Sequence, residues 1–179
     1  MVIQWIPEIV GAVIFLWYLS HQAGRLDRLH HRIEVSLGSL DANLARRAGV
    51  AAEIANTSAL DIASASLLAQ AAHNALTYHP DGLDVRMQAE NELTSTIAEI
   101  FADEEDLAQF RLDQAAAVLI SELIAVSKRV QLSRRFHADA VHACLNIRNQ
   151  RIVRWLHLAG RAAIPQTLDF DDQLPLTLR

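Results

Sequence analysis

Histidine and cysteine are the residue types of this sequence best suited to metal binding or nucleophilic catalysis, and the chain has 8 His and 1 Cys. His137 and Cys144 would share one helix face, but they would lie about 10 Å apart along the axis, too far for proton transfer. His30 and His31 are adjacent and would point about 100° apart around a helix. The chain has no H-E-x-x-H motif and no glycine-rich phosphate loop. We therefore predict that the protein is not an enzyme and has no catalytic residues, metal ligands or cofactor.

Charged side chains also stand where apolar ones are expected. Arg47 takes the next helical step after Leu40 and Leu44. Arg134 and His137 interrupt a later apolar stripe in the same way. An unpaired buried ion costs several kcal/mol, so a cation on a core-facing stripe needs a polar partner. The candidate partners are Asp41, Asp139 and Asn146.

We interpret these positions as a polar layer between the first and the third long helix. The layer would be centred on Asp41, Arg47, Arg134 and Asp139 and would fix the register of the two helices. The alternative is that the helices rotate and place these side chains at the boundary with solvent. The structural and interaction candidates are Asp41, Arg46, Arg47, Arg134, His137, Asp139 and Asn146.

The helix that must position the first of these residues is predicted from an amphipathic stretch, His31 to Ala55. Its apolar residues recur at steps of four, three and four, which puts them on one helix face; they are Ile33, Leu37, Leu40 and Leu44. Small residues continue this spacing at Ala48, Ala52, Ala55 and Ala59 and would let a partner helix approach closely. No Pro and no turn cluster was identified between Leu19 and Ala75, so we expect one helix to run on to about Thr77.

Four further segments are expected after this helix. A turn is predicted at Tyr78 to Asp84, because it combines Pro, Asp-Gly and a second Asp. A second helix should follow at Val85 to Ala102, and the acidic run Asp103 to Asp106 suits the start of a third helix that reaches about Leu158. The tail from Ile164 to Arg179 reads as extended, with Phe170 available to dock on the helices.

The N-terminal stretch Val2 to Leu19 is mostly apolar. A helix of about 18 residues is about 27 Å long, close to the thickness of a bilayer's hydrocarbon core. Trp5, Trp17 and Tyr18 are placed like interfacial aromatic belts, and Pro7 is tolerated in a first helical turn. Glu8 should lie near the outer interface, because a carboxylate is costly at mid-bilayer. A signal peptide and a buried or interfacial helix are the competing interpretations.

Positive charge sets the expected orientation of this anchor. Arg25, Arg28 and Arg32 follow the apolar stretch and no Lys or Arg precedes it, so the N-terminus should be outside and the rest cytoplasmic. The net charge of -5 argues against nucleic-acid binding. The single cysteine excludes an internal disulfide. The length of 179 residues suits one domain.

These observations predict an all-α fold. Residues 1–20 would form a transmembrane anchor in the cell membrane, residues 21–163 an elongated antiparallel bundle of three or four helices, and residues 164–179 an extended tail. The expected partners are the lipid bilayer and another protein, with a homo-oligomer as an alternative and no nucleic acid.

Two segments resemble the LemA family of bacterial membrane proteins. The first is LDRLHHRIEVSLGSLDANLARRA, with an L-D-x-x-L-x-R-R core that ends at Arg46 and Arg47. The second, SRRFHADAV, is similar to the family's A-R-x-F-Y-N-D-A-V segment, although His137 and Ala138 replace its Tyr-Asn pair and the proline after the later Asn is missing. Further matching positions are Asn91, Leu93, Glu122, Leu123, Asn146 and Phe170.

The resemblance implies a single-pass anchor with its N-terminus outside and a cytoplasmic helical bundle, and it implies no reaction. We therefore expect a LemA-like scaffold or adaptor that binds another protein at the inner face of the membrane, in envelope maintenance or signalling. The alternative is a ligand-binding or catalytic bundle that uses the polar layer between the first and third helices. Self-assembly at the membrane surface, through the alanine face, is a third interpretation.

Overall fold

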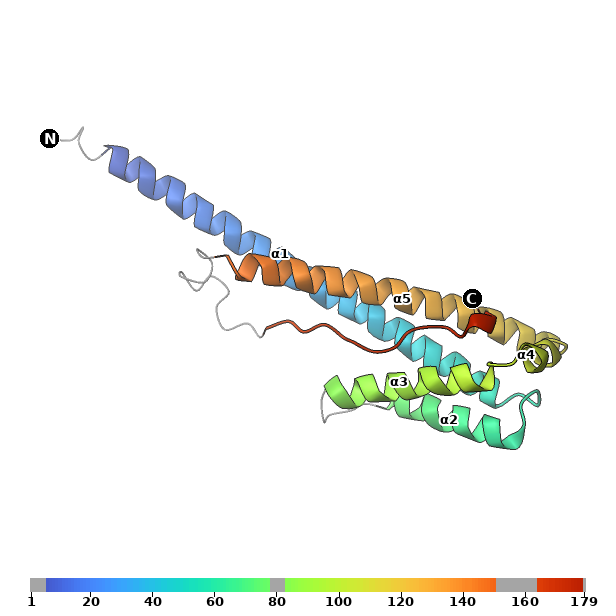
Figure 1. Ribbon diagram of the computed structural model, residues 1–179. Coiled ribbons are helices and arrows are strands. Elements are labelled where there is room, and N and C mark those ends of the chain that lie inside the picture. The colour runs from blue at the N-terminus through green and yellow to red at the C-terminus, as the bar shows by residue number, and fades with distance from the viewer. Residues whose placement is uncertain (1–5, 78–82, 151–163, 179) are drawn as a thin grey trace. The chain divides into compact units, whose positions relative to one another are not determined.

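A computed structural model of the chain describes residues 6–77, 83–150 and 164–178 (Figure 1). These residues form five α-helices and a short 3-10 helix and contain no strand, which confirms the all-α prediction. The helices are α1 (Ile6–Ala55), α2 (Ile62–Leu76), α3 (Leu83–Ile100), α4 (Glu104–Phe110) and α5 (Gln114–Arg148), followed by η2 (Leu176–Leu178).

The chain divides into two compact units. We call residues 1–36 with 137–167 the first unit and residues 37–136 with 168–179 the second unit. Helices α1 and α5 each contribute one part to either unit, whereas α2, α3 and α4 belong to the second unit alone. The predicted boundaries at residues 20 and 163 separate a membrane anchor from the helical bundle and the bundle from the tail. They are not boundaries between these two units, and they stay predictions.

The second unit is built on the small and apolar side chains of α1 that follow Leu44. Ala48, Ala51 and Ile54 are completely buried, and α2 and α3 supply Leu68 and Leu93 to the same core. The short side chains of α1 let these helices approach closely. Helix α4, the start of α5 and the tail contribute further buried residues of this core, which include Leu107, Phe110, Ile120, Leu123, Leu174 and Leu178.

A second apolar cluster in this unit holds the tail. Phe170 and Leu168 are buried against Leu40 and Leu44 of α1 and Val130 of α5. The tail is therefore non-helical up to η2 but firmly packed, and Phe170 docks on the helices.

The first unit has a smaller core. Leu26 of α1 packs with Cys144 and Ile147 of α5, and Leu29 and Ile33 of α1 cover it in part. On α1, helical spacing relates Leu26, Leu29 and Ile33, so these residues form one stripe that faces α5 in this unit.

The expected continuous helix up to Thr77 is wrong, because α1 ends at Ala55 and α2 begins at Ile62. The side chains of Asn56 and Thr57 donate hydrogen bonds to the carbonyl groups of Ala52 and Ile54, at 2.8 and 2.7 Å. Polar side chains of this kind compete with the helical pattern and favour turns. The stretch N-T-S-A-L-D is therefore a turn signal within the span expected to be one continuous helix.

Asp61 begins α2 as its N-cap. Its carboxylate accepts hydrogen bonds from the backbone N–H groups of Ala63 and Ser64, at 2.9 and 3.1 Å. Hydrogen bonds from Ser64, side chain first and backbone second, lower the pKa of Asp61 from its ordinary value of 3.8. Because the pKa is lower in the folded state, the stability from this cap is present above the ordinary value and is lost as pH falls through the folded value.

We predict that Asp61→Asn removes this pH dependence, because an asparagine can keep the cap but carries no charge. The measurement is helix content by circular dichroism against pH, with the wild-type chain as reference. The wild type should lose more helix than the variant below about pH 4. Superimposable titration curves would contradict the assigned role of Asp61.

The region predicted to form a single third helix contains two helices. Asp103 caps the short helix α4, whose chain then turns at Arg111. Asp113 accepts hydrogen bonds from the N–H groups of Ala115 and Ala116 and so begins α5. The helix ends at Arg148, earlier than the predicted Leu158. Residues 151–163, and most of the predicted turn at residues 78–84, lie outside the described residues.

The N-terminal part of α1 carries the predicted anchor. Among the described residues, no helix is both long enough and apolar enough to cross a membrane. Trp5 lies outside the described residues. Trp17 is exposed and its ring stacks on that of His21, with 5.8 Å between the ring centroids. Tyr18 is half-buried and accepts a hydrogen bond from Gln22 at 2.9 Å.

Candidate functional site

A buried ion pair lies at the centre of the second unit. Nη2 of Arg47 is 2.6 Å from Oε2 of Glu90, and each side chain is only 3% exposed. The guanidinium also donates a hydrogen bond to the Thr94 hydroxyl, at 3.2 Å. Its Nε–H is buried and has no hydrogen-bond partner among the described residues. The charges of the pair therefore compensate each other, but one buried hydrogen-bond donor of Arg47 has no partner among the described residues.

The tail is bound to α3 through its backbone. The carbonyl oxygen of Asp171 lies 2.8 Å from the hydroxyl of Thr94, which links the tail to the Arg47–Glu90 pair. The N–H of Asp171 donates to the side chain of Asn91 at 2.6 Å. Both backbone groups of residue 171 are thus paired with side chains of α3, which satisfies their hydrogen-bonding capacity.

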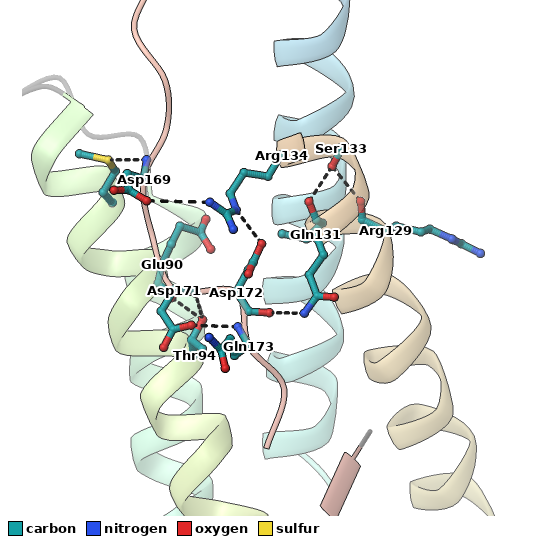
Figure 2. Close-up of polar contacts among 12 residues, drawn as sticks. Glu90, Thr94, Arg129, Gln131, Ser133, Arg134, Asp169, Asp171, Asp172 and Gln173 are labelled. Atoms are coloured by element: carbon teal, nitrogen blue, oxygen red, sulfur yellow. Dashed lines mark hydrogen bonds and ion pairs between the residues drawn. The ribbon is translucent and has the colours of Figure 1, made fainter. Parts of the chain in front are cut away.

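The same tail segment is bound to α5 through charge. Nε of Arg134 is 2.6 Å from the Asp172 carboxylate, and Nη1 lies 3.9 Å from Asp169 (Figure 2). The guanidinium also lies over the ring of Phe170, 5.7 Å from its centroid. Gln131 donates a hydrogen bond to the carbonyl oxygen of Asp172 at 2.7 Å. We call residues 168–174 the docked tail segment.

Two more exposed ion pairs involve α1 in this unit. Asp41 accepts from Arg86 of α3 at 2.6 Å. Arg46 donates through Nε to Glu122 of α5 at 2.9 Å and lies 3.5 Å from Glu53. The hydrogen bond with Glu122 raises the pKa of Arg46. Exposed pairs of this kind contribute little stability, although they can favour one helix register.

The predicted partners of the two buried or half-buried arginines are wrong. Arg47 binds Glu90 and Arg134 binds Asp172, whereas Asp41, Asp139 and Asn146 are the partners expected from the sequence. The true partners come from α3 and from the tail, which the layer hypothesis left out. Glu90 carried a usable signal, because it stands at helical spacing before Leu93 and Ile97 on the apolar stripe of α3. A lone acid on such a stripe is the complement that Arg47 needs.

Asp139 and Asn146 lie in the first unit, where both side chains are exposed. Asp139 makes no hydrogen bond or ion pair with the described residues. We predict that Asp139→Ala changes the free energy of unfolding by less than about 0.5 kcal/mol. Urea denaturation measures this, with Asp172→Ala, which removes the partner of Arg134, as the variant expected to lose clearly more. Equal losses of unfolding free energy in the two variants would contradict this prediction and support a place for Asp139 in the predicted polar layer.

His137 and Cys144, which carry acid–base and nucleophilic side chains, lie in the first unit. Nδ1 of His137 is 3.2 Å from the hydroxyl of Ser36, which also donates to the carbonyl oxygen of Ile33 at 2.9 Å. His137 is buried. Burial raises the pKa of the Cys144 thiol, and Arg148 opposes this effect. A thiol with a raised pKa is protonated and unreactive, so the geometry favours a structural role for Cys144.

Among the described residues, no group of three His, Cys, Asp or Glu side chains could hold a metal ion. A pocket of about 270 Å³ in the second unit is lined by Asp61, Phe101 and Phe110, among others. The carboxylate of Asp61 already caps α2. The polar residues of the second unit thus bind one another and hold the tail in place.

Comparison with known proteins gives no relative for this chain: no family model, no curated protein and no solved structure matches it. Its function must be inferred from its own residues.

Proposed function

We propose that this protein is a LemA-like, membrane-anchored helical scaffold that binds another protein at the inner face of the cell membrane. Its N-terminal helix would insert into the bilayer, with the N-terminus outside. The chain from residue 21 onward would lie in the cytoplasm and present a partner-binding surface. The matching L-D-x-x-L-x-R-R core, which includes the buried Arg47, supports the comparison with that family.

The observation that carries this proposal is the exposed apolar surface at the start of α1. Seven large apolar side chains there are 49% to 69% exposed, namely Ile9, Val10, Val13, Ile14, Phe15, Leu16 and Trp17. At about 100° per residue they point in all directions around the helix. A helix that is apolar all round is normally buried in a membrane or in protein.

The charges that follow this segment support the orientation. Arg25, Arg28 and Arg32 are exposed on α1, and the sequence has no Lys or Arg before them. Basic residues are enriched on the cytoplasmic side of membrane helices.

A candidate surface for the partner protein lies on α5 in the second unit. Leu132 and Phe136 are one helical turn apart and are 51% and 52% exposed. Arg129 and Arg135 lie on either side of Leu132, each about 60° away around the helix. Aromatic and arginine side chains of this kind are enriched among the residues that dominate protein–protein binding. The surface suits an apolar partner segment with acidic neighbours.

The proposal is tested by in-cell crosslinking followed by affinity purification and mass spectrometry. Full-length protein is compared with a form that lacks residues 1–20 and with Leu132→Ser/Phe136→Ser. Leu112→Ser is the control, because Leu112 is also exposed but lies outside α5. A discrete partner that is recovered with the full-length chain and the control, and lost with the double variant, supports the adaptor. Recovery of this chain alone from all forms contradicts it and favours self-assembly.

Alkaline carbonate extraction tests the anchor separately. Full-length protein should remain in the membrane pellet, and the form without residues 1–20 should be released. Release of both forms would contradict the anchor.

A further inference from the structure

An open groove of about 540 Å³ lies in the first unit, between α1 and the end of α5. Arg25, Arg28 and Arg32 line one wall, Leu29 and Ile147 provide apolar surface, and Asn146 adds a polar group from α5. Among the described residues, no acidic side chain lines it. The nearest acid on this face of α5 is Asp139, one turn before the lining residue Ala143.

The charges of α1 are separated around the helix at this level. At about 100° per residue, Arg25, Arg28 and Arg32 fall within about 60° of one another. Asp27 and Glu34 fall towards the opposite side, about 100° to 180° from each arginine. The arginine face therefore adjoins the apolar stripe that contacts α5, and the acids point away from the groove.

The three guanidinium groups are exposed, and none forms a hydrogen bond or ion pair with the part of the chain that the structure describes. This differs from the second unit, where Arg46, Arg86 and Arg134 each have a carboxylate partner. Three neighbouring cations without internal counter-ions raise the local positive potential, which is relieved when an anion binds.

The position of the groove indicates which anion. Arg25 lies eight residues after Trp17, or about 12 Å along the helix axis. Nη1 of Arg28 would be 3.7 Å from a side chain at Gly24, so this guanidinium reaches back towards the apolar segment. Arginine binds phosphate oxygens through two parallel hydrogen bonds. Basic residues next to a membrane helix are attracted to anionic lipids in the same way.

We propose that this groove binds the phosphate of an anionic phospholipid headgroup, held by Arg25, Arg28 and Arg32 while the lipid chains lie along the apolar start of α1. This inference rests on the proposed membrane anchor. The apolar surface of Leu29 and Ile147 would contact the glycerol part of the headgroup, and the arginines would replace water around the phosphate.

The test uses full-length protein in micelles of a neutral detergent. Phosphatidylglycerol or phosphatidylcholine is added, and bound lipid is counted by native mass spectrometry. Phosphatidylglycerol should bind at least tenfold more tightly, because its net negative charge is not cancelled by a choline. Arg28→Gln/Arg32→Gln should weaken its binding about 30-fold, from about 1 kcal/mol per arginine.

The matched control is Arg111→Gln/Lys128→Gln, which removes the same charge from exposed positions of the second unit. It should change binding by less than threefold. Ala143→Phe fills the groove without changing its charge and should also weaken phosphatidylglycerol binding, with circular dichroism to verify that the helices remain. Equal binding of the two lipids, or equal losses in the groove and control variants, would overturn the proposal.

Two further outcomes separate the sources of phosphate and the two proposals. Displacement of phosphatidylglycerol by an equal concentration of inorganic phosphate would assign the groove to a free anion and overturn the lipid assignment. Arginine-dependent lipid binding by a protein that carbonate extracts from membranes would overturn the anchor but support the groove. Retention of the protein in membranes, together with lipid binding that does not depend on the arginines, would support the anchor and overturn the groove proposal.

Discussion

Glu90→Ala should destabilise the protein by about 3–5 kcal/mol, because it leaves the Arg47 guanidinium buried without its counter-ion. The remaining hydrogen bonds, to the Thr94 hydroxyl and the carbonyl oxygen of residue 90, cannot replace a carboxylate at 2.6 Å. The loss should appear as a lower midpoint in urea denaturation with little change in the slope. Glu122→Ala is the matched control, since it breaks the ion pair of the neighbouring but exposed Arg46 and should have a small effect.

The double variant Arg47→Met/Glu90→Leu separates the cost of a stranded charge from the value of the pair. Apolar side chains of similar size often replace a buried ion pair without loss. The unsatisfied Nε–H of Arg47 strengthens this expectation, because the substitution also removes that buried donor. The double variant should therefore recover most of the stability that Glu90→Ala loses. A double variant as unstable as Glu90→Ala would show that packing, and not charge, dominates this site.

The sequence predicted the all-α class because helical periodicity is strong along most of the chain. The span of α3 was expected at Val85 to Ala102 and is found at Leu83–Ile100. The break before α2 was missed because its signal is polar and local: Asn56 and Thr57 bond to the end of α1, and Asp61 caps the next helix. Such signals lie in side-chain hydrogen bonds and not in periodicity.

The polar contacts could be predicted only in part. The stripe position of Arg47 correctly indicated a buried cation, as its 2% exposure confirms. The partner could not be chosen from spacing on two helices, because Glu90 comes from a third helix whose packing depends on the whole core. Arg134 shows the same limit, since its partner Asp172 lies 38 residues away in a tail without periodicity.

Phe170→Ala should release the docked tail segment and lower the free energy of unfolding by about 3 kcal/mol. The ring is buried against Leu40, Leu44 and Val130 and lies under the guanidinium of Arg134. Its removal leaves a cavity and deletes the cation–π contact, and both effects are destabilising. Without this ring, Leu168 and the polar contacts of residues 169, 171 and 172 must hold the segment. Hydrogen exchange should therefore accelerate at the Asp171 amide, and urea denaturation should report the loss of stability.

Leu176→Ala is the control in the same tail, because Leu176 is 81% exposed. It should change stability by less than about 0.5 kcal/mol and leave exchange at Asp171 slow. The comparison distinguishes docking through one buried ring from general sensitivity of the chain's end. If Phe170→Ala were as mild as Leu176→Ala, the polar contacts of Asp171 and Asp172 would be sufficient to hold the tail. The Arg134 pair would then be the principal attachment.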